Sequence, residues 1–231
     1  MRVRVATALS LTAVTVLALP ACSTDTTEAK PSATSSAGAG NPANADQRDS
    51  PLSSAALETR LLDESDLGAG YTRKPERPAR HDDVTVLGCP ALNDLGGDAA
   101  TGGPLDYHRQ AKATFTYTGS SNSEVSEELY SDTADKLSDG TGRIFDAMTG
   151  CPEYQVLVGG TAIDMATQEM TAPQLGDEQW SQLLTFSTDR RDTVVKQTAI
   201  RDGSVLLIIS GSPALVDRHL DKALAKATAA R

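Results

Sequence analysis

Residues 194–210, with the sequence VVKQTAIRDGSVLLIIS, predict the centre of the fold. Two strand-like stretches, Val194–Ile200 and Ser204–Ile209, flank Asp202-Gly203, a pair typical of a two-residue type I′ hairpin turn. The second stretch is wholly apolar from Val205 to Ile209, which favours a central strand that is covered on both faces. The sequence therefore predicts an antiparallel hairpin in the middle of a sheet.

Alternating patterns before this hairpin predict further strands. Trp180–Ser187 is one of them. Tyr154–Val158 alternates apolar and polar residues and leads into Gly159-Gly160, which suits a hairpin turn. The partner strand of that second hairpin would carry Ile163 and Met165. Two hairpins in series indicate antiparallel pairing.

The first half of the chain has a weaker strand signal. Ala111–Tyr117 alternates with a period of two and predicts a half-buried strand. Ser123–Ser131 fits either a second strand or the start of a helix. Tyr71–Val86 is charged and contains proline, and this composition favours a loop or an edge strand.

Two short helices are expected near the start of the folded region. Ser50-Pro51 has the pattern of an N-cap followed by proline, and it predicts a helix over residues 51–62. The segment Asp63–Gly70 would interrupt this pattern. A short turn or helix is expected to begin at Leu87–Pro90 and to end at Gly96-Gly97.

Two longer helices complete the prediction. The first carries one apolar face, is weakened by Gly140 and Gly142, and ends at Gly150–Pro152. The second begins at Ser212-Pro213 and buries Leu215, Val216, Leu220, Ala223, Leu224 and Ala227. We therefore expect one α+β domain over residues 52–231, a twisted antiparallel β-sheet flanked by helices.

The N-terminus has the pattern of a lipoprotein signal peptide over residues 1–21. Arg2 and Arg4 precede an apolar stretch that is shorter than a membrane-spanning helix. The sequence Leu19-Pro20-Ala21-Cys22 then resembles the bacterial lipobox. In such lipoproteins the cysteine thiol receives a diacylglycerol, the signal is removed, and the new amino terminus is often acylated, for example with palmitate. Lipidation at Cys22 is therefore expected.

Residues 22–51 are predicted to form a disordered polar tether. The segment from Ser23 to Pro51 contains no large apolar or aromatic residue, so it cannot bury enough surface to become ordered. As a flexible chain it would span about 30 Å. We expect an extracytoplasmic domain that is held at the outer face of the cell membrane by the lipid on Cys22, with the membrane as its first partner.

Composition excludes several classes of protein. The 231 residues include 21 basic and 31 acidic side chains, which gives a net charge of −10. Nucleic-acid binding is not expected, because it requires clustered lysine and arginine. Only the N-terminus is apolar over a long stretch, which excludes a membrane protein with several spans.

Two cysteines remain if Cys22 is acylated. Cys89 and Cys151 are expected to form a disulfide, because an exported pair is normally oxidised. Closing a loop of about 62 residues would stabilise the fold by about 4 kcal/mol. A zinc site is not expected, because neither a CxxC motif nor a Cys/His spacing typical of zinc is present.

No motif predicts catalysis. The nucleophile elbow, the phosphate-binding loop and the dinucleotide-binding motif are all missing. His81-Asp82-Asp83 is better interpreted as a solvated loop than as a cation site, His108 as an exposed residue, and His219 as a residue on a helix flank. We expect neither enzyme activity nor a cofactor nor a metal, and a triad of distant residues stays the least favoured alternative.

Two clusters of acidic residues are candidates for calcium binding: Asp63, Glu64 and Asp66, and Glu124, Glu127 and Glu128. Neither cluster has the EF-hand pattern, so we interpret both as solvated charged faces. The candidates for a ligand groove are Tyr71 and Trp180. For Trp180 the alternative is that the indole fills the core.

Several short motifs carry a family resemblance. They are the lipobox, the polar tether, Leu61-Leu62 with Asp66-Leu67 and Gly70-Tyr71, the cysteine pair with Pro152, and the terminal helix. Together they resemble actinobacterial lipoproteins related to the PknH-like extracellular sensor domains of mycobacterial receptor serine/threonine kinases. The resemblance implies a mixed α and antiparallel-β domain with a cleft for an unknown ligand. Kinase-type members carry two disulfides, whereas this chain allows one.

Three functions are consistent with these observations. The first is a lipid-anchored binding or sensor-like module for a cell-envelope ligand, which could be a lipid, a glycan or a peptide. The second is a scaffold or accessory subunit for another envelope protein, and the third is a cryptic hydrolase. We expect the first, and a concavity near Trp180 or Tyr71 would favour it.

Overall fold

The structure is a computed structural model, and it describes residues 50–76, 84–96, 99, 107–119, 123–188 and 191–229. The predicted signal peptide, Cys22 and nearly all of the predicted tether lie outside these residues, as does His81-Asp82-Asp83. Among the described helices, none is long and apolar enough to cross a membrane.

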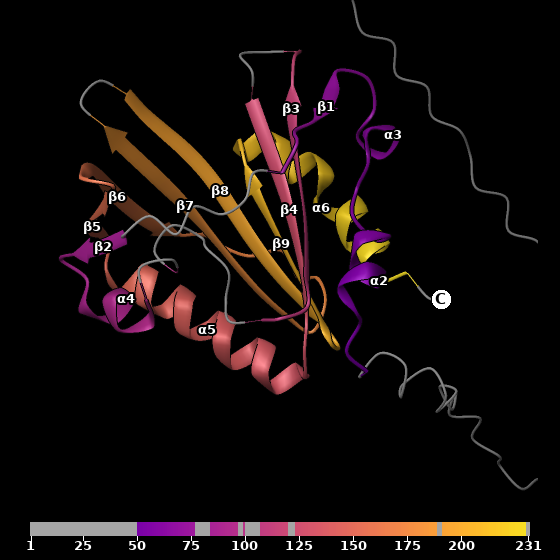
Figure 1. The fold of residues 1–231 in the computed structure, drawn as a ribbon, viewed down its shortest axis with the longest axis horizontal. Coiled ribbons are helices and arrows are strands. Elements are labelled where there is room, and N and C mark those ends of the chain that lie inside the picture. The colour runs from indigo at the N-terminus through magenta and orange to yellow at the C-terminus, as the bar shows by residue number, and fades with distance from the viewer. Residues whose placement is uncertain are drawn as a thin grey trace, which may run out of the picture. The chain divides into compact units, whose positions relative to one another are not determined.

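A single antiparallel sheet organises the described residues (Figure 1). The order of its strands is β1-β3-β4-β9-β8-β7-β6-β5-β2. The bounds are β1 (Tyr71–Arg73), β2 (Val84–Leu87), β3 (Gln110–Tyr117), β4 (Ser123–Ser131), β5 (Glu153–Val158), β6 (Thr161–Glu169), β7 (Glu178–Thr188), β8 (Arg191–Asp202) and β9 (Val205–Gly211). The expected α+β fold with an antiparallel sheet is confirmed.

Helices cover both faces of the sheet. The bounds are α2 (Ser54–Glu58), α3 (Glu64–Leu67), α4 (Pro90–Leu95), α5 (Ala134–Gly150) and α6 (Pro213–Ala227). The short helices α2 and α3 share an apolar cluster with α6, and α4 contacts α5. Figure 1 shows α6 behind the sheet and α5 on the opposite side. The two sides are called the α6 face and the α5 face below.

Strand β9 is covered on both faces, as its apolar sequence predicts. Val205, Leu207 and Ile209 belong to the cluster that contains α6. Leu206 and Ile208 point the other way and pack in the cluster that contains Leu137 and Phe145 of α5. All five side chains are buried. Strand β9 therefore contributes side chains to two separate cores, one on each face of the sheet.

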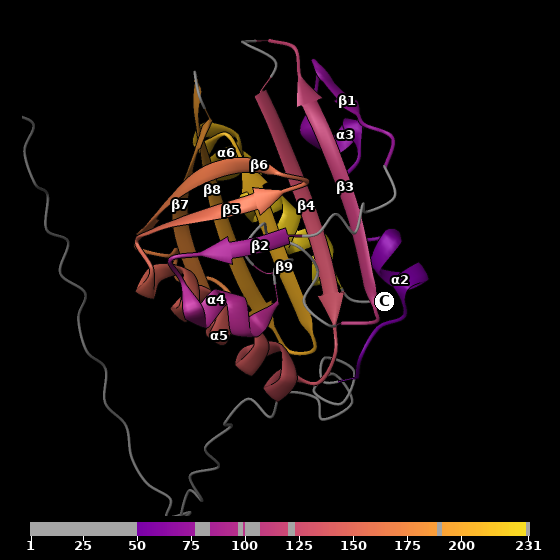
Figure 2. The same cartoon turned by 60° about the vertical axis from the view of Figure 1, so that its left-hand side comes forward.

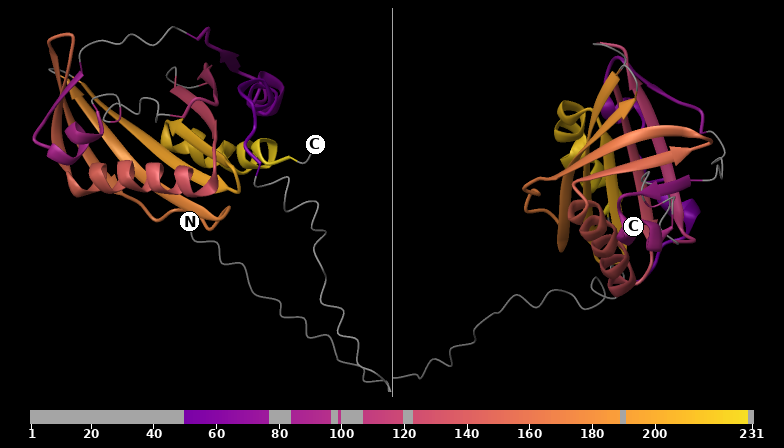
Figure 3. Two further views of the ribbon diagram at one scale, coloured as in Figure 1. Left: turned by 60° about the horizontal axis from the view of Figure 1, so that its bottom comes forward. Right: turned by 90° about the vertical axis from the view of Figure 1, so that its left-hand side faces the viewer.

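The far end of the sheet curls over the α5 face. Figures 2 and 3 show β6, β5 and β2 turning round in front of the central strands. Apolar side chains fill the space inside the curl, among them Val86, Val156, Met165 and Leu184, and they pack against Met148 of α5. The α5 face is therefore concave, with its centre near the C-terminal end of α5.

The N-terminal helix prediction was wrong in its bounds. Helix α2 is capped by Ser53, whose side chain accepts a hydrogen bond from Ala56 N, and the helix ends at Glu58. The residues that follow cannot continue it, because Asp63 caps α3 and accepts from the backbone amides of Ser65 and Asp66. Helix α2 thus covers only the middle of the helix predicted over 51–62, and α3 lies within Asp63–Gly70, the segment predicted to interrupt it.

The central hairpin turn was predicted one residue too early. Asp202 is paired with Val205, so the two turn residues are Gly203 and Ser204. Gly203 has φ +58, a conformation that glycine adopts without strain. The Asp177 carboxylate accepts a hydrogen bond from Gly203 N at 2.8 Å, which holds the turn from outside the hairpin.

The remaining strand predictions are confirmed. Ser123–Ser131 is a strand rather than the start of a helix, and Tyr71–Val86 supplies both edge strands of the sheet, β1 and the start of β2. Gly159-Gly160 forms the two-residue turn, because Val158 pairs with Thr161.

Candidate functional site

One register row across the α5 face is polar from β7 to β3. Gln182 pairs with Gln197, Gln197 with Ser210, Ser210 with Ser126, and Ser126 with Thr114. We call these five residues the polar row. They lie on the α5 face because Gln182 and Gln197 alternate with residues that point to the other side, and because Gln182 contacts Met148 of α5.

The two glutamines are buried and linked. Gln182 is 0% exposed and Gln197 is 9% exposed. The Gln182 amide nitrogen donates to Gln197 Oε1 at 2.8 Å and also contacts Met148 Sδ at 3.3 Å. The Gln197 amide nitrogen in turn contacts Ser210 Oγ at 3.5 Å. The hydroxyl residues Ser210, Ser126 and Thr114 are half-buried.

One polar atom of this network is unsatisfied. Gln182 Oε1 is buried and has no hydrogen-bond partner among the described residues. Leaving a buried acceptor unpaired costs about 1–3 kcal/mol, so such groups are rare in native proteins. The neighbours of Gln182 on the same face of β7 are Trp180 and Leu184, which shows that apolar side chains fit at this depth. The polar row is therefore a departure from core packing that needs an explanation.

The polar row contains no charged side chain. Carboxylates lie beside it on the same face: Glu169 of β6 is in register with Gln182 and is exposed, and Glu124 and Glu128 flank Ser126 along β4. Glu124 accepts a hydrogen bond from Lys74, and Glu128 accepts from Lys112 and from the Tyr130 hydroxyl. Burial, together with the carboxylate of Glu128, raises the pKa of Tyr130. The five residues of the row therefore offer only neutral donors and acceptors, and the carboxylates lie at its edges.

The two ligand candidates from the sequence lie on opposite faces of the sheet. Trp180 is half-buried on the α5 face, next to Gln182 along β7, with its ring centroid 6.2 Å from that of Phe145. Tyr71 is buried on the α6 face and stacks on Tyr117 at 4.7 Å. The structure therefore does not bring the two together, and only Trp180 lies beside the polar row.

His219 lies on α6 beside Leu215 and Leu220, as interpreted from the sequence, and its side chain is buried. Its Nε2 lies 2.6 Å from the Tyr71 hydroxyl, and the residue is 5% exposed. Burial lowers the pKa of His219, and the nearby Arg218 and Lys222 lower it further. A neutral imidazole bonded to a tyrosine joins β1 to α6.

Glu127 is also buried, so the interpretation of its acidic group as a solvated face was wrong at this position. It is 1% exposed, and its Oε2 accepts from Leu62 N at 2.6 Å, whereas Oε1 has no partner among the described residues. Burial raises the pKa of Glu127 to about 7. The alternation of Glu127 with Val125 and Leu129 along β4 is the sequence signal that could have predicted this burial.

The other acidic group forms ion pairs. Lys226 of α6 binds both Asp63 and Asp66, and Lys222 binds Asp66. Hydrogen bonds from Ser65, Lys226 and the backbone hold the pKa of Asp63 below its ordinary value. No group of three or more histidine, cysteine and acidic residues able to hold a metal occurs in the described part of the chain.

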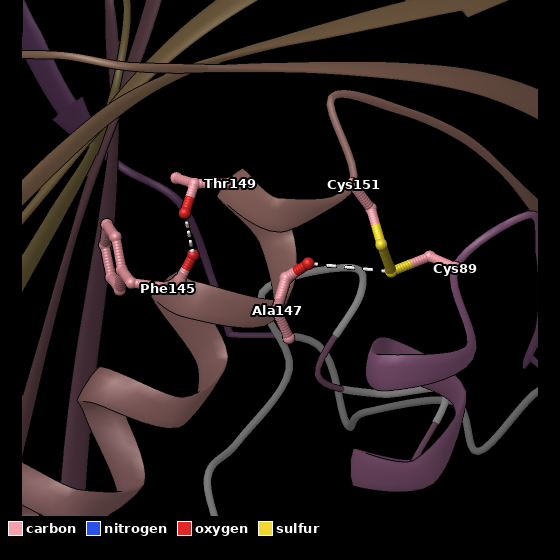
Figure 4. Close-up of a disulfide and its surroundings, with 5 residues drawn as sticks. All are labelled: Cys89, Phe145, Ala147, Thr149 and Cys151. Atoms are coloured by element: carbon pink, nitrogen blue, oxygen red, sulfur yellow. Dashed lines mark hydrogen bonds between the residues drawn. A yellow bond between two sulfur atoms is a disulfide. The ribbon is translucent and has the colours of Figure 1, made fainter.

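The predicted disulfide is present (Figure 4). Cys89, at the start of α4, is bonded to Cys151, at the end of α5, with a Cα–Cα distance of 5.7 Å. The carbonyl of Ala147 lies 3.5 Å from Cys89 Sγ. The bond thereby fixes α4 to the C-terminal end of α5, beside Met148 and the buried end of the polar row.

The chain is similar to known proteins in its fold and not in its sequence. No protein family and no curated protein matches the sequence. Among solved structures, the extracellular domain of PknH from Mycobacterium tuberculosis is similar with a TM-score of 0.57 and 13% identity, over 78% of this chain and 98% of that one. An uncharacterized protein from Mycobacterium smegmatis is similar with a TM-score of 0.40 and 12% identity, over 75% of this chain and 94% of that one.

The first of these similarities shows a shared fold. The expectation that this chain folds like a PknH-type extracellular domain is therefore confirmed at the level of architecture. At 13% identity it assigns no ligand and no binding residue.

Proposed function

We propose that this chain is an extracytoplasmic binding module, sensor-like in architecture, which is anchored to the membrane through a lipid on Cys22 and holds a ligand of the cell envelope on its α5 face. The observation that carries this proposal is the polar row, with two buried glutamines and one buried, unpaired acceptor. A bound molecule that donates to Gln182 Oε1 would remove the cost of burying it.

The surroundings of the polar row support the same site. Small-molecule sites place a few convergent polar groups on an otherwise apolar wall. Met148 and Leu184 supply apolar wall at the row's buried end. The shared fold with the extracellular domain of PknH supports an extracytoplasmic position.

A non-catalytic role fits the chemistry of the described residues. The buried histidine, His219, is engaged by Tyr71 on the opposite face from the polar row. The row itself consists of amides and hydroxyls, Glu128 beside it is paired with Lys112 and Tyr130, and Glu169, which is in register with Gln182, is exposed to solvent.

Native mass spectrometry tests the proposal. The full chain, purified in detergent, is exposed to extract of its own cell envelope and compared with the double variant Gln182→Leu/Gln197→Leu. Gln168→Leu, at an exposed position on the other face of β6, is the matched control. We expect a discrete added mass on the wild-type and control chains that the double variant loses. Equal retention by all three would overturn the assignment of the site, and no added mass on any would overturn the function.

A further inference from the structure

The chemistry of the polar row specifies what kind of ligand it can recognise, if the proposed binding function holds. Each glutamine amide offers two donors and one acceptor, and each serine or threonine hydroxyl can act as either. Groups of this kind match other neutral groups that both donate and accept. A hydroxyl group is the simplest such partner.

Charge argues against an anionic ligand. The described residues of the polar row include no lysine or arginine, and the two lysines beside its β3 end are both paired, Lys112 with Glu128 and Lys74 with Glu124. The whole chain carries a net charge of −10, which repels phosphates and carboxylates. Recognition of an acidic headgroup would require bidentate or clustered cations, which this row does not supply.

Spacing argues for a repeating ligand. The polar row occupies corresponding positions on five neighbouring strands, from Gln182 on β7 to Thr114 on β3. Neighbouring strands lie about 4.8 Å apart, which is close to the length of one sugar unit in a linear glycan. A chain of sugar rings laid across the strands would therefore present hydroxyls in step with the row.

We infer that the polar row binds a neutral, polyhydroxylated ligand, a linear glycan without charged substituents, laid across strands β7 to β3 on the α5 face. Gln182 and Gln197 form the buried end of this site, and because Gln182 is 0% exposed and in contact with Met148, a ligand hydroxyl reaches Gln182 Oε1 only when the Met148 side chain moves aside. Ser210, Ser126 and Thr114 form its more accessible end.

The chain contains a built-in reporter for this test. Trp180 is the single tryptophan of the sequence, and it lies two residues from Gln182 on the same face of β7. Residues two apart on a strand are separated by about 7 Å, so the indole senses a ligand at the buried end of the row. A change in its emission therefore reports on this site and on no other aromatic group.

The experiment is a fluorescence titration of the full chain in a detergent without a sugar headgroup. The probe is the pool of neutral oligosaccharides released from the envelope of the producing cell, and the acidic oligosaccharides of the same envelope serve as the comparison. We expect saturable change in Trp180 emission with the neutral pool, an affinity at least tenfold weaker for the acidic pool, and unchanged binding in Gln168→Leu. Gln182→Leu and the double variant Gln182→Leu/Gln197→Leu should each lose binding at least tenfold.

The outcomes separate this inference from the proposed function. If the neutral pool does not bind but the envelope extract leaves a lipid or peptide mass on the chain, the ligand class is wrong and the binding function stands. If the acidic pool binds as well as the neutral pool, the inference is overturned as well. Circular dichroism and thermal unfolding of each variant establish that it is folded, so that a loss of binding is not a loss of structure.

Discussion

At the scale of single residues, Glu127 couples the fold to pH. Its pKa is raised by burial from 4.5 to about 7, so the folded chain keeps a proton that the unfolded chain releases in this interval. The unfolded state then binds fewer protons, and the free energy of unfolding falls as pH rises from about 4.5 to 7. The loss that belongs to Glu127 is about 3 kcal/mol.

Glu127→Gln should remove this dependence. Glutamine keeps an acceptor for Leu62 N but does not ionise, so the variant should become more stable than the wild type above pH 7. Denaturant unfolding at pH 5, 6, 7 and 8 measures the difference, which should grow with pH. Parallel stability curves for the two chains would contradict the account. Glu127→Leu, which also does not ionise but leaves Leu62 N unpaired, should be less stable than Glu127→Gln by about 1–3 kcal/mol at every pH.

The glutamine pair should be dispensable for folding. Replacing both Gln182 and Gln197 by leucine removes the hydrogen bond between them together with the unpaired Gln182 Oε1. Exchanging both partners for apolar groups is often neutral or stabilising, so the double variant should be within about 1 kcal/mol of the wild type or more stable. Gln182→Leu alone should be less favourable, because Gln197 Oε1 then loses its partner. Thermal unfolding compares the three chains, and a strongly destabilised double variant would mean that the row is structural.

At the scale of elements, helix α5 contains two glycines with opposite roles. A Cβ on Gly140 would lie 2.2 Å from the hydroxyl oxygen of Tyr107, whereas one on Gly142 would meet nothing within 4 Å. Tyr107 is buried, and its hydroxyl contacts the Lys136 and Leu137 carbonyl oxygens, so it cannot move aside freely. The prediction that both glycines merely weaken the helix therefore holds only for Gly142.

The two alanine variants should shift stability in opposite directions. Gly142→Ala should stabilise the chain by about 1 kcal/mol through helix propensity. Gly140→Ala should destabilise it, because the new methyl overlaps Tyr107. Tyr107→Phe should reverse much of that loss when combined with Gly140→Ala, since it removes the overlapping oxygen. Equal effects of the two alanine substitutions in denaturant unfolding would contradict this packing.

The disulfide between α4 and α5 should be a major source of stability. Cys89 and Cys151 are separated by 62 residues. In the chain-entropy description, a disulfide that closes a loop of this length restricts the unfolded chain and adds about 4 kcal/mol to the free energy of unfolding. Cys89→Ala/Cys151→Ala should show this loss in denaturant unfolding, and reduction of the wild type should reproduce it. Cys22→Ser serves as the control, with no expected change in unfolding.

The elements could be predicted where the signal is local. Alternation gave Ala111–Tyr117 and Tyr154–Val158, and the apolar run at Val205–Ile209 gave a central strand, because each pattern reflects one strand's own faces. The polar row could not be predicted in this way. Its five residues come from five strands, and each looks like an ordinary polar position until the register of β7, β8, β9, β4 and β3 aligns them.

Capping and turn errors have a similar origin. Ser50-Pro51 fits an N-cap, but Ser204 Oγ donates to the Ser50 carbonyl and Leu52 N donates to Ser131 Oγ, and the helix begins only after Ser53. Asp202-Gly203 fits a turn, but Asp202 stays paired with Val205 and Gly203 is held by the distant Asp177. Tertiary contacts thus overrode the local signal at both places.

At the scale of the whole molecule, we propose that the lipid on Cys22 holds the domain at the membrane. Cys22→Ser should move the chain from the membrane fraction to the soluble fraction when cells are broken and separated. It should also remove the acyl mass from the N-terminal peptide in mass spectrometry. If the wild-type peptide at Cys22 carries no acyl group, the chain is not anchored in this way.

Tyr71 and Trp180 show how the whole sheet determines a site. Both were aromatic candidates in the sequence, and the sheet separates them onto opposite faces. The Tyr71 hydroxyl is already bonded to His219 beneath α6, whereas Trp180 lies next to Gln182 on the concave face. The central claim is therefore that the ligand of this module binds along the polar row on the α5 face.

A crystal structure of the full chain, crystallised after exposure to extract of its own envelope, tests this claim most directly. We expect ordered ligand density along the polar row, with an atom of the ligand within hydrogen-bond distance of Gln182 Oε1. Ligand density at another place, or a row closed by the chain's own side chains with no ligand bound, would contradict it.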